Sequence, residues 1–289
     1  MAAEANNVTL STNFNVDPYY DDFNETKNFH RILFRPGLAV QARELTQMQT
    51  ILQNQIDRFA GHIFKEGSTV QGLETYYDSI YPYLKLRDKN STGANTINLA
   101  DFVGKTIKGA NSGVLALVSN YSAGSESLAP SYKTLHIKYL SANTTTNYSI
   151  FKANEIITAV GFPALTANTI TSAQSNNAGR PDGLGIAVKF GAGIVYAKDH
   201  FIRVPEQTIV LDKYSQFPSV RVGFDITETI VTEQNDDTLL DPAQGSYNYS
   251  APGAARLKLE ATIKSVQLTD TVSNTFVELM RVENGVVQS

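Results

Sequence analysis

The sequence predicts a mostly β protein with one long amphipathic α-helix near its N-terminus, a small antiparallel barrel and a β-sandwich-like domain. Two observations carry this prediction. Residues 34–64 form the only long run with helical periodicity, and the rest of the chain consists of short alternating runs separated by Gly, Asn, Asp and Ser turns. With 289 residues, of which 42% are apolar, the chain is long enough to bury a sizeable core.

The helical stretch reads FRPGLAVQARELTQMQTILQNQIDRFAGHIF. Pro36-Gly37 predicts a turn before the helix, because proline fixes φ and glycine tolerates positive φ. Gly67 is a plausible stop. Apolar residues recur at spacings of three and four and therefore share one stripe of the helix surface. The members of this apolar stripe are Leu45, Met48, Leu52, Ile56, Phe59 and Ile63.

The sequence leaves two possibilities for what this stripe packs against. An amphipathic helix usually packs on its own domain. Alternatively the stripe mediates self-association or docking on another chain. Gln55 occupies the position where a strict three-four alternation requires an apolar residue, and a polar residue in a helix seam can fix register or oligomer number. If the helix stays straight, Ile56 occupies the stripe in place of Gln55.

Residues 1–32 predict an extended N-terminal arm. Its segment VDPYYDDFNE combines four acids with three aromatic residues. The spacing of the acids does not match a calcium-binding loop with a central glycine and a terminal glutamate. We expect Tyr19, Tyr20 and Phe23 to anchor the arm on a neighbouring surface while the acids face water.

Four further segments follow the arm. Residues 33–96 contain the helix and the first strands. Residues 97–165 resemble a self-contained unit, with strands predicted at 105–108, 113–119, 134–140 and 156–160 between polar turns, which favours a small antiparallel barrel. Residues 166–184 are small and polar and predict a linker. Residues 185–289 predict a β-sandwich-like domain that continues in a longer native chain, because the sequence stops just after a strand and a new apolar pair, Val286-Val287.

Within the last segment, IAVKFGAGIVYAKDHFIRV suggests a hairpin through residues 191–193. Residues 232–256 form a long turn-rich excursion of the kind that is usually functional or interfacial. Strands are predicted at 206–211, 219–226, 257–267 and 276–282. Along 257–267 the apolar residues alternate, which places Leu257, Leu259, Ala261 and Ile263 on one face.

Composition argues against several classes of function. The net charge of -4 gives the chain no excess of basic residues, which argues against nucleic acid as its main partner. The chain has no cysteine, so it has no disulfide, thiolate metal site or cysteine nucleophile. The N-terminus lacks the pattern of a secretory signal, and no apolar run is long enough to insert in a membrane.

No catalytic, metal or cofactor motif stands out. The four histidines, at positions 30, 62, 136 and 200, lack metal-ligand spacing. The run around Gly183 and Gly185 is followed by a strand-like segment where a dinucleotide loop needs a helix. Asp236, Asp237 and Asp241 share a loop and keep a sugar-cleaving carboxylate pair open, although a solvated acidic loop explains them more simply. We therefore expect a protein that is not an enzyme and that uses no cofactor or metal.

Several runs resemble a family of structural proteins of tailed bacteriophages, common in contractile-tailed phages of cyanobacteria and other marine bacteria. They are FNVDPYYDDFNETKNFHRILFRPGLAVQARELTQMQTILQNQIDRFAGHIFKEGSTVQG, VYAKDHFIRVPEQTIVLDKYSQFPSVRVGF, DDTLLDPAQGSYNYSAPGAARLKL and ELMRVENGVVQS. The family is described only as a domain of unknown function in tail, baseplate or tail-fibre proteins. The resemblance covers the arm, the helix and the second strand block, whereas residues 97–165 look like an insertion.

The resemblance implies a virion component of the distal tail, made in the host cytoplasm, that acts by assembly. We expect a baseplate-associated or fibre-anchoring subunit, most simply a homotrimer built around the helix and in contact with other tail proteins. A baseplate wedge subunit, present as a monomer or dimer, is the first alternative. A tip protein that binds a host receptor or surface glycan is the second.

Overall fold

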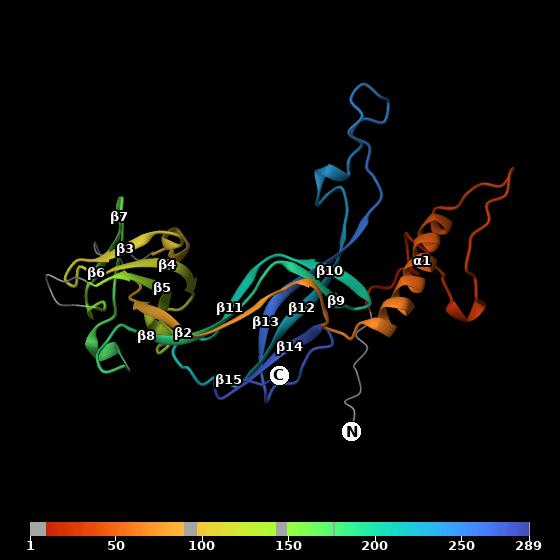
Figure 1. The fold of residues 1–289 in the computed structure, drawn as a ribbon. Coiled ribbons are helices and arrows are strands. Elements are labelled where there is room, and N and C mark those ends of the chain that lie inside the picture. The colour runs from red at the N-terminus through yellow and green to blue at the C-terminus, as the bar shows by residue number, and fades with distance from the viewer. Residues whose placement is uncertain (1–9, 90–96, 143–148, 176, 289) are drawn as a thin grey trace. The chain divides into compact units, whose positions relative to one another are not determined.

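The computed structural model describes residues 10–89, 97–142, 149–175 and 177–288. Its described part is mostly β, with three antiparallel sheets and one α-helix, α1 (Ala42–Ile63), as the sequence predicts (Figure 1). Short 3₁₀ helices punctuate the loops. They are η1 (Glu25–Lys27), η2 (Leu99–Phe102), η3 (Glu126–Leu128), η4 (Ser172–Gln174) and η5 (Asp237–Leu239).

The chain divides into two compact units, each assembled from separate segments. Unit 1 contains the chain up to Thr75 together with Phe190–Gln207 and Arg221–Met280. Unit 2 contains Tyr76–Lys189, Thr208–Val220 and the residues from Arg281 onward. The chain therefore passes between the units several times, so neither unit is one uninterrupted stretch of sequence.

Unit 1 carries α1 and most of two sheets. The first has the order β1-β9-β10 and the second the order β13-β12-β14-β15. Burial along β13 alternates, with the four predicted inward positions less exposed than their neighbours, which confirms the predicted period of two. The strands are β1 (Thr69–Gly72), β9 (Gly193–Ala197), β10 (His200–Val204), β12 (Val220–Val231), β13 (Arg256–Gln267), β14 (Phe276–Glu283) and β15 (Val286–Val287).

The hairpin predicted at residues 191–193 is wrong. The strand that precedes these glycines, β8 (Asp182–Phe190), and the strand that follows them, β9, belong to different sheets, so the glycines connect two sheets. The hairpin instead joins β9 to β10, where Ala197 pairs with His200 across a two-residue turn, Lys198-Asp199. Both turn residues have positive φ, 50° and 60°, as a tight hairpin turn requires. Because this turn contains no glycine, the sequence pattern did not indicate it.

Unit 2 is built on a sheet with the strand order β11-β8-β2-β5-β4-β3-β6-β7. The strands predicted at 105–108, 113–119, 134–140 and 156–160 are present as β3 to β6. The bounds are β2 (Thr75–Leu86), β3 (Thr106–Gly109), β4 (Leu115–Ser122), β5 (Lys133–Ser141), β6 (Ile156–Ala159), β7 (Phe162–Asn168), β8 (Asp182–Phe190) and β11 (Gln207–Asp212).

A hydrophobic core is built from residues of this sheet and of η2. Phe102, Ile107 and Leu135 are completely buried in it. The closed barrel expected from the sequence is not confirmed, because the pairing of the described strands runs from β11 to β7 without closing. The stretch 166–184, expected as a linker, contains the end of β7 and the start of β8, and Ile170 within it is buried.

Two glycines give a matched test of packing in unit 1. A Cβ on Gly223 of β12 would lie 1.9 Å from the carbonyl oxygen of Val277 on β14, whereas a Cβ on Gly61 of α1 would meet Tyr196 Oη at 3.7 Å. Gly223→Ala should lower the free energy of unfolding by roughly 1–3 kcal/mol through overpacking. Gly61→Ala should raise it by about 0.5–1 kcal/mol, because alanine is the better helix former. Urea unfolding of both variants measures this, and equal effects would contradict the close approach of the two strands.

Candidate assembly surface

Local interactions define where α1 starts and stops. Gly37 adopts a φ of 81° in the predicted Pro36-Gly37 turn. At the helix start, the backbone N–H of Gln41 donates to Glu44 Oε2 at 2.9 Å, which satisfies a donor that the helix itself cannot use. At the other end, Phe64 leaves the helix in an extended conformation. The helix is uninterrupted between these points.

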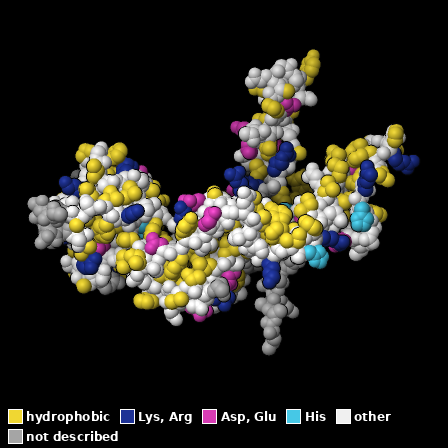
Figure 2. All heavy atoms as spheres, in the orientation of Figure 1, with side chains coloured by type: hydrophobic (Ala, Val, Ile, Leu, Met, Phe, Trp, Pro, Cys, Tyr) yellow, Lys and Arg dark blue, Asp and Glu magenta, His cyan; other side chains and the backbone are white. Residues whose placement is uncertain are grey.

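The apolar stripe of α1 is exposed. Its six side chains keep between 42% (Met48) and 69% (Phe59) of their surface accessible, and within the helix only Ile51 and Ala60 are buried. Apolar side chains are visible over α1 in the space-filling view (Figure 2). The expectation that the stripe packs on its own domain is therefore wrong for the described part of the chain.

The arm occupies the opposite, donor-rich side of α1. Asp21 is buried and accepts a hydrogen bond from the Thr50 hydroxyl. Asp22 accepts from Gln47 Nε2 at 3.0 Å, and Glu25 forms an ion pair with Arg58. Figure 1 shows the arm, in red, beside the helix.

The expectation that the arm's acids face water is therefore wrong for Asp21. The Thr50 hydroxyl replaces water at Asp21, whereas the Asp22 side chain, 3.5 Å from Arg43, stays 45% exposed. The arm thereby covers the side of α1 that could have remained in water, and it leaves the apolar side uncovered.

Of the three aromatic residues expected to anchor the arm, Tyr19 and Tyr20 make contacts within it. The Tyr20 side chain is 53% exposed, and its hydroxyl donates to Asp17 Oδ1 at 3.1 Å. The Tyr19 ring lies 6.2 Å from that of Phe14. Phe23 is partly buried beside α1 and lines shallow depressions between arm and helix. The structure thus brings Phe23 to the helix and leaves Tyr20 available, and the intersubunit role of these residues stays a prediction.

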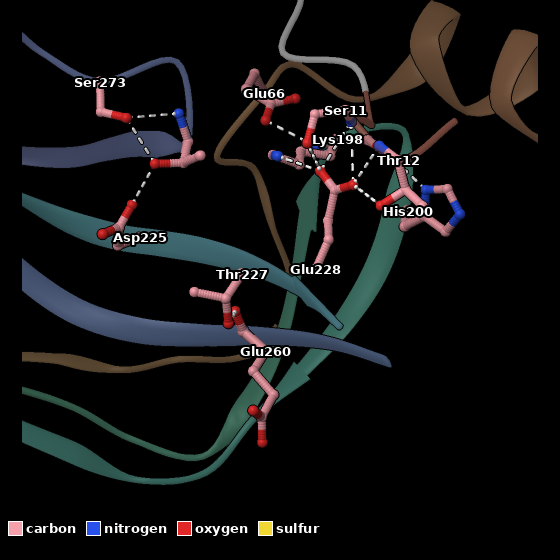
Figure 3. Close-up of polar contacts among 11 residues, drawn as sticks. Ser11, Thr12, Glu66, Lys198, His200, Asp225, Thr227, Glu228, Glu260 and Ser273 are labelled. Atoms are coloured by element: carbon pink, nitrogen blue, oxygen red, sulfur yellow. Dashed lines mark hydrogen bonds and ion pairs between the residues drawn. The ribbon is translucent and has the colours of Figure 1, made fainter. Parts of the chain in front are cut away.

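A buried ion pair fixes the start of the described arm to unit 1. Lys198 Nζ donates to Glu228 Oε1 at 2.5 Å, and the two side chains are only 2% and 5% exposed. The backbone N–H groups of Ser11 and Thr12 donate to the same carboxylate at 3.0 Å and 2.9 Å, and both hydroxyls donate as well. Figure 3 shows these bonds converging on Glu228 from the arm and from the β9–β10 turn. We call this group the arm clasp.

The clasp strongly favours ionised Glu228. Burial by itself would raise the pKa of this carboxyl, but hydrogen bonds from Lys198, Thr12 and Ser11 outweigh burial and lower the pKa from 4.5 to about 2. Glu66 accepts the backbone N–H of Lys198 at 2.9 Å, so a second carboxylate holds the turn. Burial raises the pKa of Glu66.

Sequence reasoning did not find the clasp. Its members come from the arm, from a hairpin turn and from β12, and they lie as far as 217 residues apart. No spacing rule links such positions. The one local feature that could have pointed to the clasp is the turn at Lys198-Asp199. The hairpin prediction missed this turn because it relied on the glycines at 191–193.

Three of the residues considered for chemistry have structural roles. Asp236 Oδ1 accepts the Thr238 backbone N–H at 2.9 Å and caps η5, and Asp241 Oδ1 accepts the Ala243 N–H at 2.8 Å. His136 is buried and stacks on Tyr81, with ring centroids 5.0 Å apart. Burial lowers the pKa of His136 to about 4.

The described residues contain no group of three or more histidine and acidic side chains placed to hold a metal ion. No helix among them combines the length and hydropathy needed to cross a bilayer.

A family model described as "Domain of unknown function (DUF4815)" matches residues 17–86 and 181–289. The chain belongs to this family. No curated protein and no solved structure matches it. The DUF4815 match includes the second half of the arm, all of α1, β1, β2 and the strands from β8 onward, so it contains the apolar stripe and the Lys198–Glu228 pair.

The DUF4815 match is interrupted at residues 87–180, which hold β3 to β7. This interval includes the 97–165 unit that the sequence predicts as an insertion. It begins directly after β2 and ends directly before β8, and these two strands are neighbours in the sheet. The backbone N–H of Lys85 donates to the carbonyl of Pro181 at 2.8 Å, so the two junctions lie together.

The Lys198–Glu228 pair makes a first prediction for the clasp. Glu228→Gln should lower the free energy of unfolding by about 3–5 kcal/mol, because it leaves the Lys198 ammonium buried without its counter-charge. Lys198→Met combined with Glu228→Gln should recover a good part of this loss. A double-mutant cycle measured by urea unfolding tests the pair, and strictly additive losses would contradict the coupling.

A second prediction concerns pH. Because the pKa of Glu228 is lowered in the folded state, its stabilising effect is complete above pH 4.5 and is lost as the pH falls toward about 2. The melting temperature of the wild type should therefore fall more steeply across this window than that of Glu228→Gln. Thermal unfolding followed by circular dichroism between pH 2 and 7 measures the difference, and parallel curves would contradict it.

Proposed function

We propose that this protein is a structural subunit of a phage tail, located at the baseplate or at the base of a fibre, and that it acts by assembly and not by catalysis. The resemblance of the arm, the helix and the second strand block to tail proteins supports the proposal. The DUF4815 match falls on the same parts of the chain, although its description carries no function.

The observation that carries the proposal is the exposed apolar stripe of α1. Isolated apolar side chains are common on protein surfaces, but a continuous row along a whole helix marks an interaction site. Burying a large apolar side chain contributes roughly 1.5–3 kcal/mol relative to full exposure. Three or four stripe residues at a subunit contact would therefore hold an assembly.

A homotrimer around the helix fits this stripe best. Closed rotational symmetry lets each copy cover the same face of the next copy, so no stripe is left in water. Leu33, Phe34, Leu38 and Val40, which lead into α1, are each at least 49% exposed and extend the apolar surface. The arm, with Tyr20 exposed, is available for contacts with other tail proteins.

The finer architecture belongs to the same proposal. In unit 2 we propose a small barrel: an isolated bridge pairs Leu86 at the end of β2 with Thr169 just after β7, and Arg87 N–H donates to the Asn168 carbonyl at 2.8 Å. In unit 1 we propose a sandwich-like packing, supported by the 5.4 Å contact between the rings of Phe190 and Phe224 and by the Gln207 amide, which bonds to β13. Rigid β-domains suit a structural role.

A charge-introducing double variant tests the proposal. Met48→Asp with Ile56→Asp should abolish self-association, because burying unpaired carboxylates in a subunit contact is costly. It should leave a folded monomer, because both side chains are exposed in the single chain. Light scattering over a wide concentration range and circular dichroism measure the two effects.

The matched control is Leu128→Asp with Leu140→Asp, which alters two exposed apolar residues of unit 2. It should leave the oligomer intact. A fully assembled Met48/Ile56 variant would refute the role of the stripe. Antibodies against the protein should label the distal tail of virions that contain it, and labelling of the capsid alone would refute the location.

A further inference from the structure

Two different repeats can describe the apolar stripe, and they place different residues at its centre. A seven-residue repeat continuing from Leu45, Met48 and Leu52 would next use Gln55, Phe59 and His62. An eleven-residue repeat keeps Phe59 but uses Ile56 and Ile63 in place of Gln55 and His62. Leu45, Met48 and Leu52 recur eleven residues later as Ile56, Phe59 and Ile63. An eleven-residue repeat spans 3.67 residues per turn, so its apolar row stays on one side of a nearly straight helix with a slight right-handed drift.

The structure favours the eleven-residue frame. α1 is continuous from Ala42 to Ile63, and every residue of this frame is exposed on the uncovered side. The arm covers the opposite side through Gln47, Thr50 and Arg58. The surface that the chain leaves free is therefore the surface that repeats.

The charges of α1 lie away from the stripe or are already engaged. Arg43 and Arg58 pair with acids of the arm. Asp57 accepts a hydrogen bond from Gln53 at 2.6 Å, and Glu44 caps the first turn. The uncharged Gln49 and Gln55 flank the stripe. Identical copies can therefore approach through it without repulsion between like charges, which makes a second copy of this chain a suitable occupant.

The available area agrees with a multi-copy contact. Six large side chains at about half exposure offer on the order of 600 Å² per copy, given that fully buried large side chains cover roughly 150–250 Å² each. A standard interface takes about 800 Å² from each partner. The apolar residues that precede the helix, such as Leu38 and Val40, supply the remainder.

We propose that α1 assembles with copies of itself as a parallel, in-register bundle that follows the eleven-residue repeat, with Ile56 and Ile63 inside and Gln55 and His62 at the margin. This inference rests on the proposed self-association. Helices that run along a threefold axis must point the same way, because rotation about the axis preserves direction. Each layer of the bundle then consists of one residue type, from Leu45 at one end to Ile63 at the other.

Cysteine cross-linking tests the parallel arrangement cleanly, because the chain has no cysteine of its own. In a parallel bundle, Leu45→Cys cross-links with itself under mild oxidation. In an antiparallel pair, Leu45→Cys cross-links only when mixed with Ile63→Cys. The control is Arg43→Cys, which projects about 200° around the helix from Leu45 and should give at most background cross-linking.

A lysine pair tests the repeat. Ile56→Lys should raise the dissociation constant of the oligomer at least tenfold, whereas Gln55→Lys should change it less than threefold. A seven-residue frame predicts the reverse order. Circular dichroism confirms that both variants fold, which is expected because both positions are exposed in the single chain.

The outcomes separate this inference from the proposed function. A wild-type chain that stays monomeric at high concentration overturns the self-association and the bundle together. An oligomer that cross-links only in the Leu45→Cys and Ile63→Cys mixture overturns the parallel bundle alone. An oligomer disrupted more by Gln55→Lys than by Ile56→Lys overturns the eleven-residue repeat. Self-cross-linking of Leu45→Cys together with the predicted lysine order supports the inference.

Discussion

The chain covers the polar side of its one long helix and leaves the apolar side in water. Asp21 is buried against Thr50, whose hydroxyl replaces water, while Glu25 pairs with Arg58 in a half-exposed position. A hydrogen bond of this kind contributes only about 0.5–1.5 kcal/mol net, because it replaces a hydrogen bond to water. An exposed apolar stripe has no such compensation, and this imbalance is the physical reason why we propose association.

The arm can take this position because it is tied down at its start. Ser11 and Thr12 satisfy the Glu228 carboxylate that Lys198 holds in the interior, so the arm forms part of a buried electrostatic group and is more than a loose tail. An unpaired charge at this depth would be costly, so the ion pair and the arm support one another. The same group fixes the β9–β10 turn, which couples the arm to the sheets of unit 1.

How much the sequence predicted depended on the range of each interaction. Strands such as β3 to β6 and the alternation along β13 follow from local patterns and were predicted. The stripe from Leu45 to Ile63 was found, but its exposure could not be, because that depends on which face the arm covers. The contacts Asp21–Thr50 and Lys198–Glu228 join distant segments, and no periodicity encodes them. The β9–β10 turn was missed because Lys198-Asp199 carries no glycine signal.

The parts of the chain differ in how they depend on one another. The interval 87–180, outside the DUF4815 match, starts after β2 and ends before the neighbouring strand β8, with Lys85 and Pro181 in contact at the junction. Its strands β3 to β7 extend the same sheet, and β5 pairs with the end of β2, so changes in these strands bear on the register of β2. α1 and the arm clasp lie in the other unit and take no residue from this interval. The apolar stripe and the α1 residues that the arm contacts therefore lie within the DUF4815 match, whereas Ser11 and Thr12 of the clasp precede it.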